Sequence, residues 1–133
     1  MRDDRGQALI VSVLILAIAA VTLSGLRIAQ ERILDDARSR RAGEAAVSAA
    51  TAVIADEYAA ARLLNEKDVA AVVTASSARE AARAAARGLS LANGGDGDID
   101  EVTVLCRSRS IDVAITSHGR VHRAAFEASC SQP

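Results

Sequence analysis

Aromatic side chains are scarce in this 133-residue chain, which has one tyrosine, one phenylalanine and no tryptophan. Few surfaces are therefore available for stacking on nucleic-acid bases or for anchoring a partner protein. An excess of charge is lacking as well, because the formal net charge at pH 7 is −1. Nucleic-acid-binding proteins usually carry a strongly basic face, so the composition argues against nucleic acid as a partner.

Large core-forming residues and cysteines are limited too. Half of the residues are hydrophobic, but most of these are alanine and valine, which predicts a thin core built by close approach of its elements. The two cysteines, Cys106 and Cys130, lie in the C-terminal third. An even number beyond a membrane-targeting segment fits one disulfide in an oxidising compartment, with two buried free thiols as the alternative.

The most informative feature is an uncharged apolar run from Ala8 to Leu26. As an α-helix rising about 1.5 Å per residue it would measure about 29 Å, close to the ~30 Å hydrocarbon core of a bilayer. Three interpretations compete: a secretory signal cleaved after Ala17-Ile18-Ala19, an uncleaved single-span anchor, and a leader that loses only the residues before the run. The apolar region of a signal peptide is shorter, about 7–15 residues, so the length favours the second and third interpretations.

The charges around this run conflict over topology. Five arginines follow the run and only Arg2 and Arg5 precede it, so a literal count of positive charges places the C-terminal part in the cytoplasm. The expected disulfide and the translocation of long domains regardless of charge argue for the opposite orientation. We therefore expect a single-pass protein of the cytoplasmic (inner) membrane with an external C-terminal domain. The arginines after the run are Arg27, Arg32, Arg38, Arg40 and Arg41.

A long helix is predicted from Gly6 to about Leu64, because only the single glycines Gly25 and Gly43 interrupt this stretch. Opposite charges after the apolar run stand four residues apart, which suits a solvated helix face or charge matching between neighbouring helices. The later part carries an apolar stripe at helical spacing, which we expect to pack into a core. The charge pairs are Arg27–Glu31, Arg32–Asp36, Asp36–Arg40 and Arg40–Glu44, and the stripe is Val47, Ala50, Ile54, Ala61 and Leu64.

The remaining sequence predicts further helix and then a sheet. Residues 65–68 form a predicted turn, with Asp68 capping a second helical region that ends near Gly88. A Gly/Asp-rich loop at 93–98 precedes three alternating apolar segments, which predict antiparallel strands with both cysteines facing inward. The expected fold class is α+β, with a long membrane-spanning helix, further helix and a small three-stranded antiparallel sheet. The predicted divisions are 1–6 (leader), 7–27 (transmembrane helix), 28–92 (extracytoplasmic helical region) and 93–133 (sheet).

Two groups of residues invite a metal-binding interpretation. Asp96, Asp98 and Asp100 alternate their carboxylates as calcium loops do, but the EF-hand and repeat-type calcium patterns both fail, so a solvated turn is favoured. A zinc site lacks the paired C-x₂-C ligands, so a disulfide and two ordinary histidines are favoured there. The zinc candidates are Cys106, His118, His122 and Cys130.

No arrangement of residues predicts catalysis. A serine nucleophile elbow, a phosphate-binding glycine loop and a Cys–His pair with an orienting acid cannot be placed in this sequence. We therefore expect neither enzymatic activity nor a cofactor.

Residues Arg5-Gly6-Gln7-Ala8 precede the apolar span, and a polar helix that becomes Ala-rich follows it. This arrangement resembles the TadE/TadG-like minor pilins (pseudopilins) of tight-adherence (Tad/Flp) pili, which typically carry R-G-Q-[AS] ahead of their membrane span. The resemblance covers about residues 5–60 and is only architectural beyond them. It implies that a prepilin peptidase cuts after Gly6, which makes Gln7 the mature N-terminus.

One position departs from the pattern of processed pilins, which usually carry Glu at the fifth mature position. This chain has Val11 there. The departure favours a tip, priming or assembly-platform component over a repeating major subunit. The partners that the resemblance implies are other pilin or pseudopilin subunits, the pilus assembly platform and membrane lipid.

We therefore expect a structural subunit or assembly factor of a Tad/Flp-type pilus or a related secretion machine. It would act by helix packing and subunit recognition, because small residues in the span let neighbouring helices approach closely. The alternative is a secreted small binding module released by cleavage near Ala19. The small residues are Ala17, Ala19, Ala20, Ser24 and Gly25.

Overall fold

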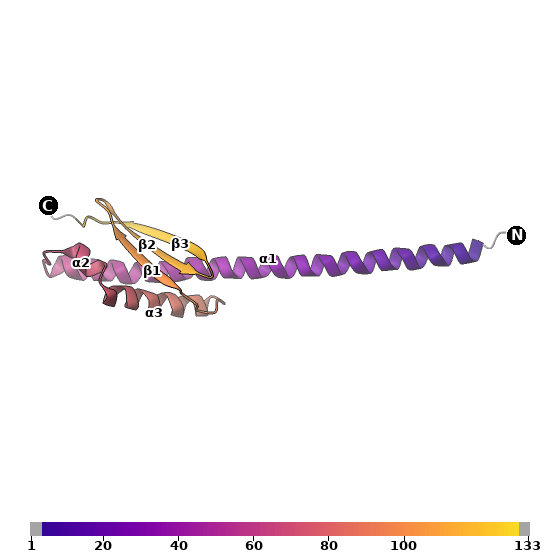
Figure 1. The fold of residues 1–133 in the computed structure, drawn as a ribbon, viewed down its shortest axis with the longest axis horizontal. Coiled ribbons are helices and arrows are strands. Elements are labelled where there is room, and N and C mark those ends of the chain that lie inside the picture. The colour runs from indigo at the N-terminus through magenta and orange to yellow at the C-terminus, as the bar shows by residue number, and fades with distance from the viewer. Residues whose placement is uncertain (1–3, 131–133) are drawn as a thin grey trace. The chain divides into compact units, whose positions relative to one another are not determined.

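The computed structural model describes residues 4–130, with side chains from Leu9 onward, and confirms the α+β fold class (Figure 1). Within the described residues there are three helices followed by a three-stranded sheet. The contacts group the chain into two compact units, Met1–Ala37 and Arg38–Pro133. Helix α1 (Asp4–Leu63) supplies residues to both units.

In the first unit, α1 is apolar on all sides from Leu9 to Leu26, and charged residues begin at Arg27. Every side chain from Leu9 to Asp35 is exposed, and none of the strongly apolar part of this helix is buried. A helix that packs on a soluble core keeps its apolar residues on one stripe and polar residues opposite. By length and composition this segment is therefore a candidate membrane span.

In the second unit, the same helix has a single buried stripe. The stripe repeats at three- to four-residue spacing, as one face of an α-helix must. The predicted core positions Val47, Ala50, Ile54 and Ala61 are confirmed. Most of the stripe is alanine, so neighbouring elements approach the helix backbone closely. Its buried members are Ala42, Ala46, Val47, Ala50, Ile54 and Ala61.

The prediction that Leu64 belongs to this stripe is wrong, because its side chain is 74% exposed. The helix ends at Leu63, and Asn65 takes a left-handed φ of 53°. The N–H of Glu66 then donates to the carbonyl of Ala61 over 3.0 Å, which closes the helix with a Schellman-type turn. Leu64 therefore lies in the cap, outside the helical repeat.

Two shorter helices follow. Helix α2 (Val69–Val73) begins as predicted at Asp68, whose Oδ1 accepts a hydrogen bond from the Ala71 N–H at 2.9 Å. Helix α3 (Ser76–Ala92) buries a stripe of small residues. The stripe is Ala78, Ala82, Ala86 and Ser90.

The predicted end of this helix at Gly88 is wrong. A single glycine costs a helix only about 1 kcal/mol, whereas the next turn offers a better stop. The side chain of Asn93 donates to the Leu89 carbonyl at 2.8 Å, and Gly94 takes a φ of 82°. These two residues end α3 one turn later than predicted.

The sheet is the predicted antiparallel meander of β1 (Glu101–Cys106), β2 (Ser110–Ser117) and β3 (Arg120–Glu127), in the order β1-β2-β3. Its inner face is mostly aliphatic and lies on the helices. Rows of inward residues align across all three strands because side chains alternate between faces. The aligned rows are Val102–Ile115–His122, Val104–Val113–Ala124 and Cys106–Ile111–Phe126.

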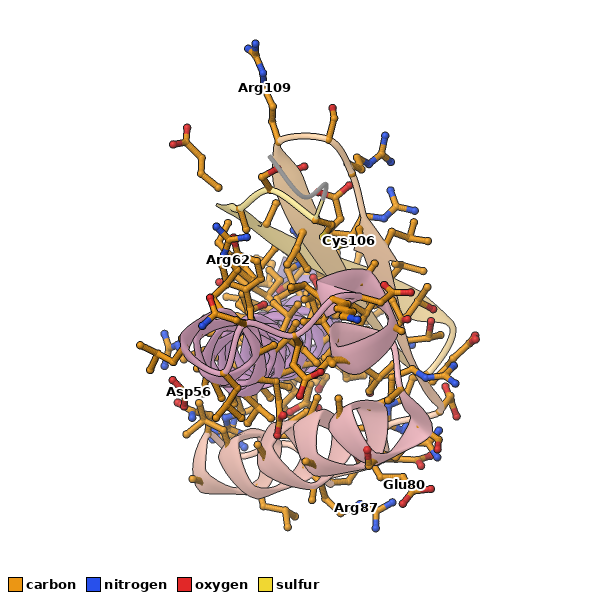
Figure 2. All side chains as sticks on the ribbon, turned by 90° about the vertical axis from the view of Figure 1, so that its left-hand side faces the viewer. Asp56, Arg62, Glu80, Arg87, Cys106 and Arg109 are labelled. Atoms are coloured by element: carbon orange, nitrogen blue, oxygen red, sulfur yellow. A yellow bond between two sulfur atoms is a disulfide. The ribbon has the colours of Figure 1, made fainter. Side chains whose placement is uncertain are left out.

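The core of the second unit lies between α1, α3 and the inner face of the sheet. Figure 2 shows α3 and the sheet flanking α1, with the labelled charged residues on the outside. The largest fully buried side chains are aliphatic, as the composition predicts. They are Ile54, Ile111, Ile115, Val73 and Val113.

Candidate functional site

The most unusual surface of the molecule is the apolar segment of α1. Its leucine, isoleucine and valine side chains are half to three-quarters exposed, for example Leu16 at 69% and Val21 at 73%. The exposed apolar side chains continue past the end of the uncharged run through Ile28, Ile33 and Leu34. An exposed apolar surface of this extent marks a site of membrane or protein contact.

The polar side chains within this segment are compatible with a bilayer. The Thr22 hydroxyl lies 3.0 Å from the Ile18 carbonyl and 2.9 Å from the Ala19 carbonyl, and the Ser24 hydroxyl donates to the Ala20 carbonyl at 2.8 Å. Each hydroxyl therefore has an acceptor on its own helix. Such internal pairing is what hydrocarbon requires, because no water is present there to bind a polar group.

The five small residues predicted for helix packing do not all share one face of α1. At 3.6 residues per turn, Ala17, Ala20 and Ser24 lie together, whereas Ala19 lies on the other side of the helix. Gly25 borders the first group, and a methyl group built on it would meet nothing within 4 Å. Gly25 therefore leaves open space on the surface of the helix, where another helix could come close to the backbone.

The predicted cleavage position lies at the beginning of the same helix. Gly6 and Gln7 are helical residues of α1. Residues 1–3 of the predicted leader 1–6 lie outside the described residues.

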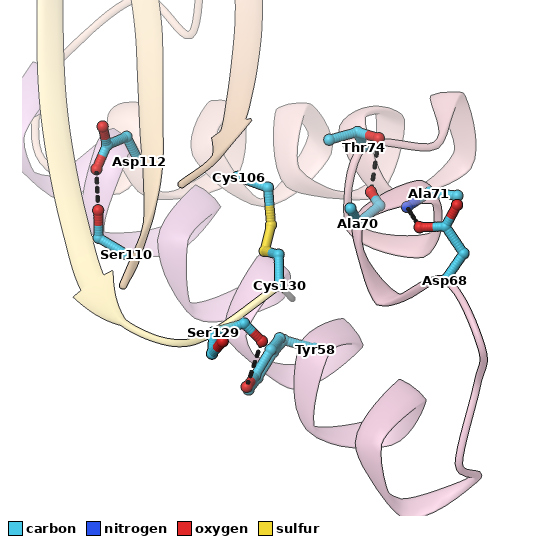
Figure 3. The surroundings of a disulfide bond; sticks show 10 residues. All are labelled: Tyr58, Asp68, Ala70, Ala71, Thr74, Cys106, Ser110, Asp112, Ser129 and Cys130. Carbon is cyan, nitrogen blue, oxygen red and sulfur yellow. Dashed lines mark hydrogen bonds between the residues drawn. A yellow bond between two sulfur atoms is a disulfide. The ribbon is translucent and has the colours of Figure 1, made fainter. Parts of the chain in front are cut away.

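A disulfide joins the end of β1 to the segment that follows β3. Cys106, the last residue of β1, is bonded to Cys130, and their Cα atoms are 6.0 Å apart (Figure 3). Next to it, the Tyr58 hydroxyl donates to the Ser129 carbonyl at 3.2 Å, and the Tyr58 ring meets Phe126 edge-on. The chain's only two aromatic residues therefore pin the end of β3 to α1. Sequence analysis missed this contact, although the shortage of aromatic residues could have suggested that they pair.

The loop that contains Asp96 and Asp98 contacts the turn between β2 and β3. Asp96 accepts a hydrogen bond from the Asp98 N–H at 2.9 Å and lies 2.8 Å from Nε2 of His118. The hydrogen bond from Asp98 lowers the pKa of Asp96 below its ordinary value, and the charge of His118 lowers it further. The Ser117 hydroxyl also donates to the Asp98 carbonyl at 2.7 Å. These contacts fix a loop and were not predicted, because they join segments about twenty residues apart.

The metal candidates are not brought together. Asp96, Asp98 and Asp100 are all exposed, and Asp96 is engaged by His118 as described. For zinc, both cysteines are consumed by the disulfide, and His122 lies against Gly43 of α1. In the part of the chain that the structure describes, no three His, Cys, Asp or Glu side chains are placed to hold a metal ion.

The outer face of the sheet carries a shallow hollow of about 500 Å³. Its floor is formed by small side chains, and an ion pair between Arg107 and Asp112 borders it. Arg123 also lines this hollow. The floor residues are Thr103, Ala114 and Ala125, with Leu105 beside them.

Comparisons with known protein families, with curated proteins and with solved structures give no match to this chain. The function must therefore be argued from its own residues.

Proposed function

We propose that this protein is a single-pass, pilin-like structural subunit or assembly factor of a Tad/Flp-type pilus or a related secretion machine. The observation that carries the proposal is the exposed apolar surface of α1 from Leu9 to Leu34. The same helix enters the core of residues 38–133 with one alanine-rich stripe. The resemblance to TadE/TadG-like minor pilins implies the same arrangement, in which one helix supplies a membrane anchor and continues into a folded domain.

The mechanism is exchange of lipid for neighbouring helices. While the segment 9–26 lies in the bilayer, its hydroxyls are paired within the helix and its aliphatic side chains contact acyl chains. On assembly, the face around Ala17, Ala20, Ser24 and Gly25 permits close approach of another subunit's helix, which gains van der Waals contact. No catalytic step is part of this function.

The disulfide supports an external location for residues 38–133. A bond between Cys106 and Cys130 forms and persists in an oxidising compartment such as the periplasm or cell surface. This supports an orientation with the C-terminal domain outside the cytoplasmic membrane and the start of the chain on the cytoplasmic side. There a prepilin peptidase would act between Gly6 and Gln7.

The decisive experiment is the mass and N-terminal sequence of the mature protein, purified from membranes of cells with and without a co-expressed Tad-type prepilin peptidase. We expect an N-terminus at Gln7 only when the peptidase is present. A matched variant, Gly6→Val, is expected to keep the uncut N-terminus. An N-terminus at Ala20, with the protein in the soluble fraction, would instead establish the secreted module and overturn the proposal.

A further inference from the structure

The outer edge of β3 is not paired with any strand of the described residues, because β3 is the last strand in the order β1-β2-β3. The hairpin before it turns through His118 and Gly119, whose φ angles are 50° and 70°. Two left-handed residues form a type I′ turn, and the residues that flank such a turn exchange both of their backbone hydrogen bonds. Ser117 and Arg120 are that pair.

Hydrogen-bonded and non-bonded pairs alternate along an antiparallel ladder. Val121 and every second residue after it therefore turn their backbone N–H and C=O groups away from β2. The hydrogen bond from the Ala128 N–H to the Arg109 carbonyl, 3.2 Å long, fits the same alternation at the far end of the strand. The residues whose backbone groups point outward are Val121, Arg123, Ala125 and Glu127.

The side chains of these four residues are also exposed on the outer face of the sheet. The residues between them are half-buried against the helices, as the strand's burial pattern shows. The edge therefore presents backbone donors and acceptors together with accessible side chains. Natural sheets usually pair, cover or charge such an edge.

The two charged residues of this edge, Arg123 and Glu127, can pair with the same two residues of a second copy. When two β3 strands pair in antiparallel fashion about Ala125, Arg123 of each copy lies directly opposite Glu127 of the other. All of these positions have outward backbone groups, so the ladder and the two ion pairs form in one register. A register centred on Arg123 would place like charges opposite each other, which is unfavourable. A register centred on Ala124 would place both charged residues opposite uncharged ones.

We propose that the β3 edge binds β3 of a second copy of this chain, antiparallel and with Ala125 on the two-fold axis. The two sheets then become one six-stranded sheet with opposite-charge pairs across the joint. On the inner face, Phe126 of one copy lies across from Ala124 of the other and extends the apolar core. This contact goes beyond the proposed membrane function and does not depend on it.

The pairing also sets the direction in which the copies meet. Along α1 and β3 the contacts advance together, from Gly43 against His122 to Tyr58 against Ser129, so the helix and the strand run the same way. A two-fold axis that reverses β3 therefore also reverses helix residues 38–63. The contact therefore joins two copies whose helix residues 38–63 run in opposite directions.

Site-specific cross-linking of the full chain in detergent micelles tests the contact. In micelles, two copies can meet in either the parallel or the antiparallel orientation. Opposed residues on the axis of an antiparallel ladder have Cα atoms about 5.5 Å apart. We expect Ala125→Cys to give a covalent dimer with a short thiol-to-thiol cross-linker. The matched control is Ala114→Cys, which lies on the same face of the sheet but one strand inward. Equal cross-linking at both positions would indicate stacked sheet faces, and its absence at position 125 would also overturn the proposal.

A charge exchange tests the register. In the Ala125→Cys background, Arg123→Glu and Glu127→Arg should each weaken dimer formation about tenfold, because each places two like-charge pairs across the joint. The double variant restores opposite charges and should recover the original yield of dimer. If the single and double variants behave alike, the charges only protect the edge from aggregation and the proposal fails. Neither outcome alters the mature N-terminus, so the proposed membrane function stands or falls separately.

Discussion

The two parts of α1 differ both in the residues they contain and in how those residues are distributed around the helix. From Leu9 to Leu34 the apolar side chains occupy every side and all are exposed. From Ala42 to Ala61 they occupy one stripe, and its members are buried against α3 and the sheet. Both parts are helical, although the first contains many isoleucines and valines, which have a lower helix propensity than the alanines of the second. The surroundings that each part needs are therefore set by the size, number and distribution of its apolar side chains, and not by the ability to form a helix.

Only the second part of α1 contributes to the folding stability of the domain, because only its residues belong to the core. The second part stabilises a small domain whose core is thin, so covalent and close-packed contacts matter there. The core contains no residue of the first part, whose exposed apolar side chains are suited to contact with lipid or with another helix. Changes in one part should therefore leave the other unaffected.

The largest expected effect comes from charging the apolar segment. In the double variant Leu16→Arg with Ile18→Arg, each arginine near the centre of a membrane helix costs about 2.5–3.5 kcal/mol. We expect the chain to leave the membrane fraction, as measured by flotation with lipid vesicles. The control is Leu63→Arg, at a position of α1 that is 83% exposed in the second unit. Loss of membrane association in the control as well would contradict the division between the two parts.

The next effect concerns the disulfide. Because it closes a loop with a sequence separation of 24, removing it with Cys106→Ser and Cys130→Ser should lower the free energy of unfolding of the domain by about 3–4 kcal/mol. Denaturant titration followed by circular dichroism measures this loss, and flotation with vesicles should be unchanged. A reducing agent should bring the unmodified protein to the stability of the variant and have no effect on the variant itself. An equally stable variant would show that the bond contributes nothing.

The smallest effect uses the same substitution in both parts of the helix. A methyl group on Gly43 would overlap the ring of His122, whereas one on Gly25 meets nothing. We expect Gly43→Ala to lower the free energy of unfolding by about 1 kcal/mol after the gain in helix propensity is subtracted. Gly25→Ala should leave the stability of the domain unchanged.

A second variant identifies the cause of this loss. Adding His122→Ala to Gly43→Ala removes the overlap, so the penalty for the alanine at position 43 should disappear when it is measured against His122→Ala alone. A penalty of the same size in both backgrounds would show that the contact with His122 is not responsible.

Local and periodic features were predictable from the sequence. The strands and their faces follow from strict alternation, as at Val102, Val104 and Cys106, and the register follows because a shift by one residue would expose the apolar face. The cap at Asp68 follows from its position before an apolar run. Helix ends were less predictable: Leu64 and Gly88 were misassigned because the residues after them make better caps.

Contacts between distant segments could not be predicted. The contact of Asp96 with His118 and the contact of Gly43 with His122 depend on how the loop, the hairpin and α1 fold onto one another. The sequence has no periodic signal for such contacts. The cysteine pair was an exception, because the chain contains only two cysteines and both lie on the inward face of the predicted strands.

The position of the disulfide also determines how the domain responds to mechanical load. Cys106 and Cys130 bracket β2 and β3, so tension applied to the chain on either side of the pair passes directly between the two sulfur atoms. The β2–β3 hairpin lies between the two cysteines and therefore carries none of this tension, so pulling does not extend it. A chain pulled in this way would lengthen by its helices and by β1, while the segment between the two cysteines is not extended.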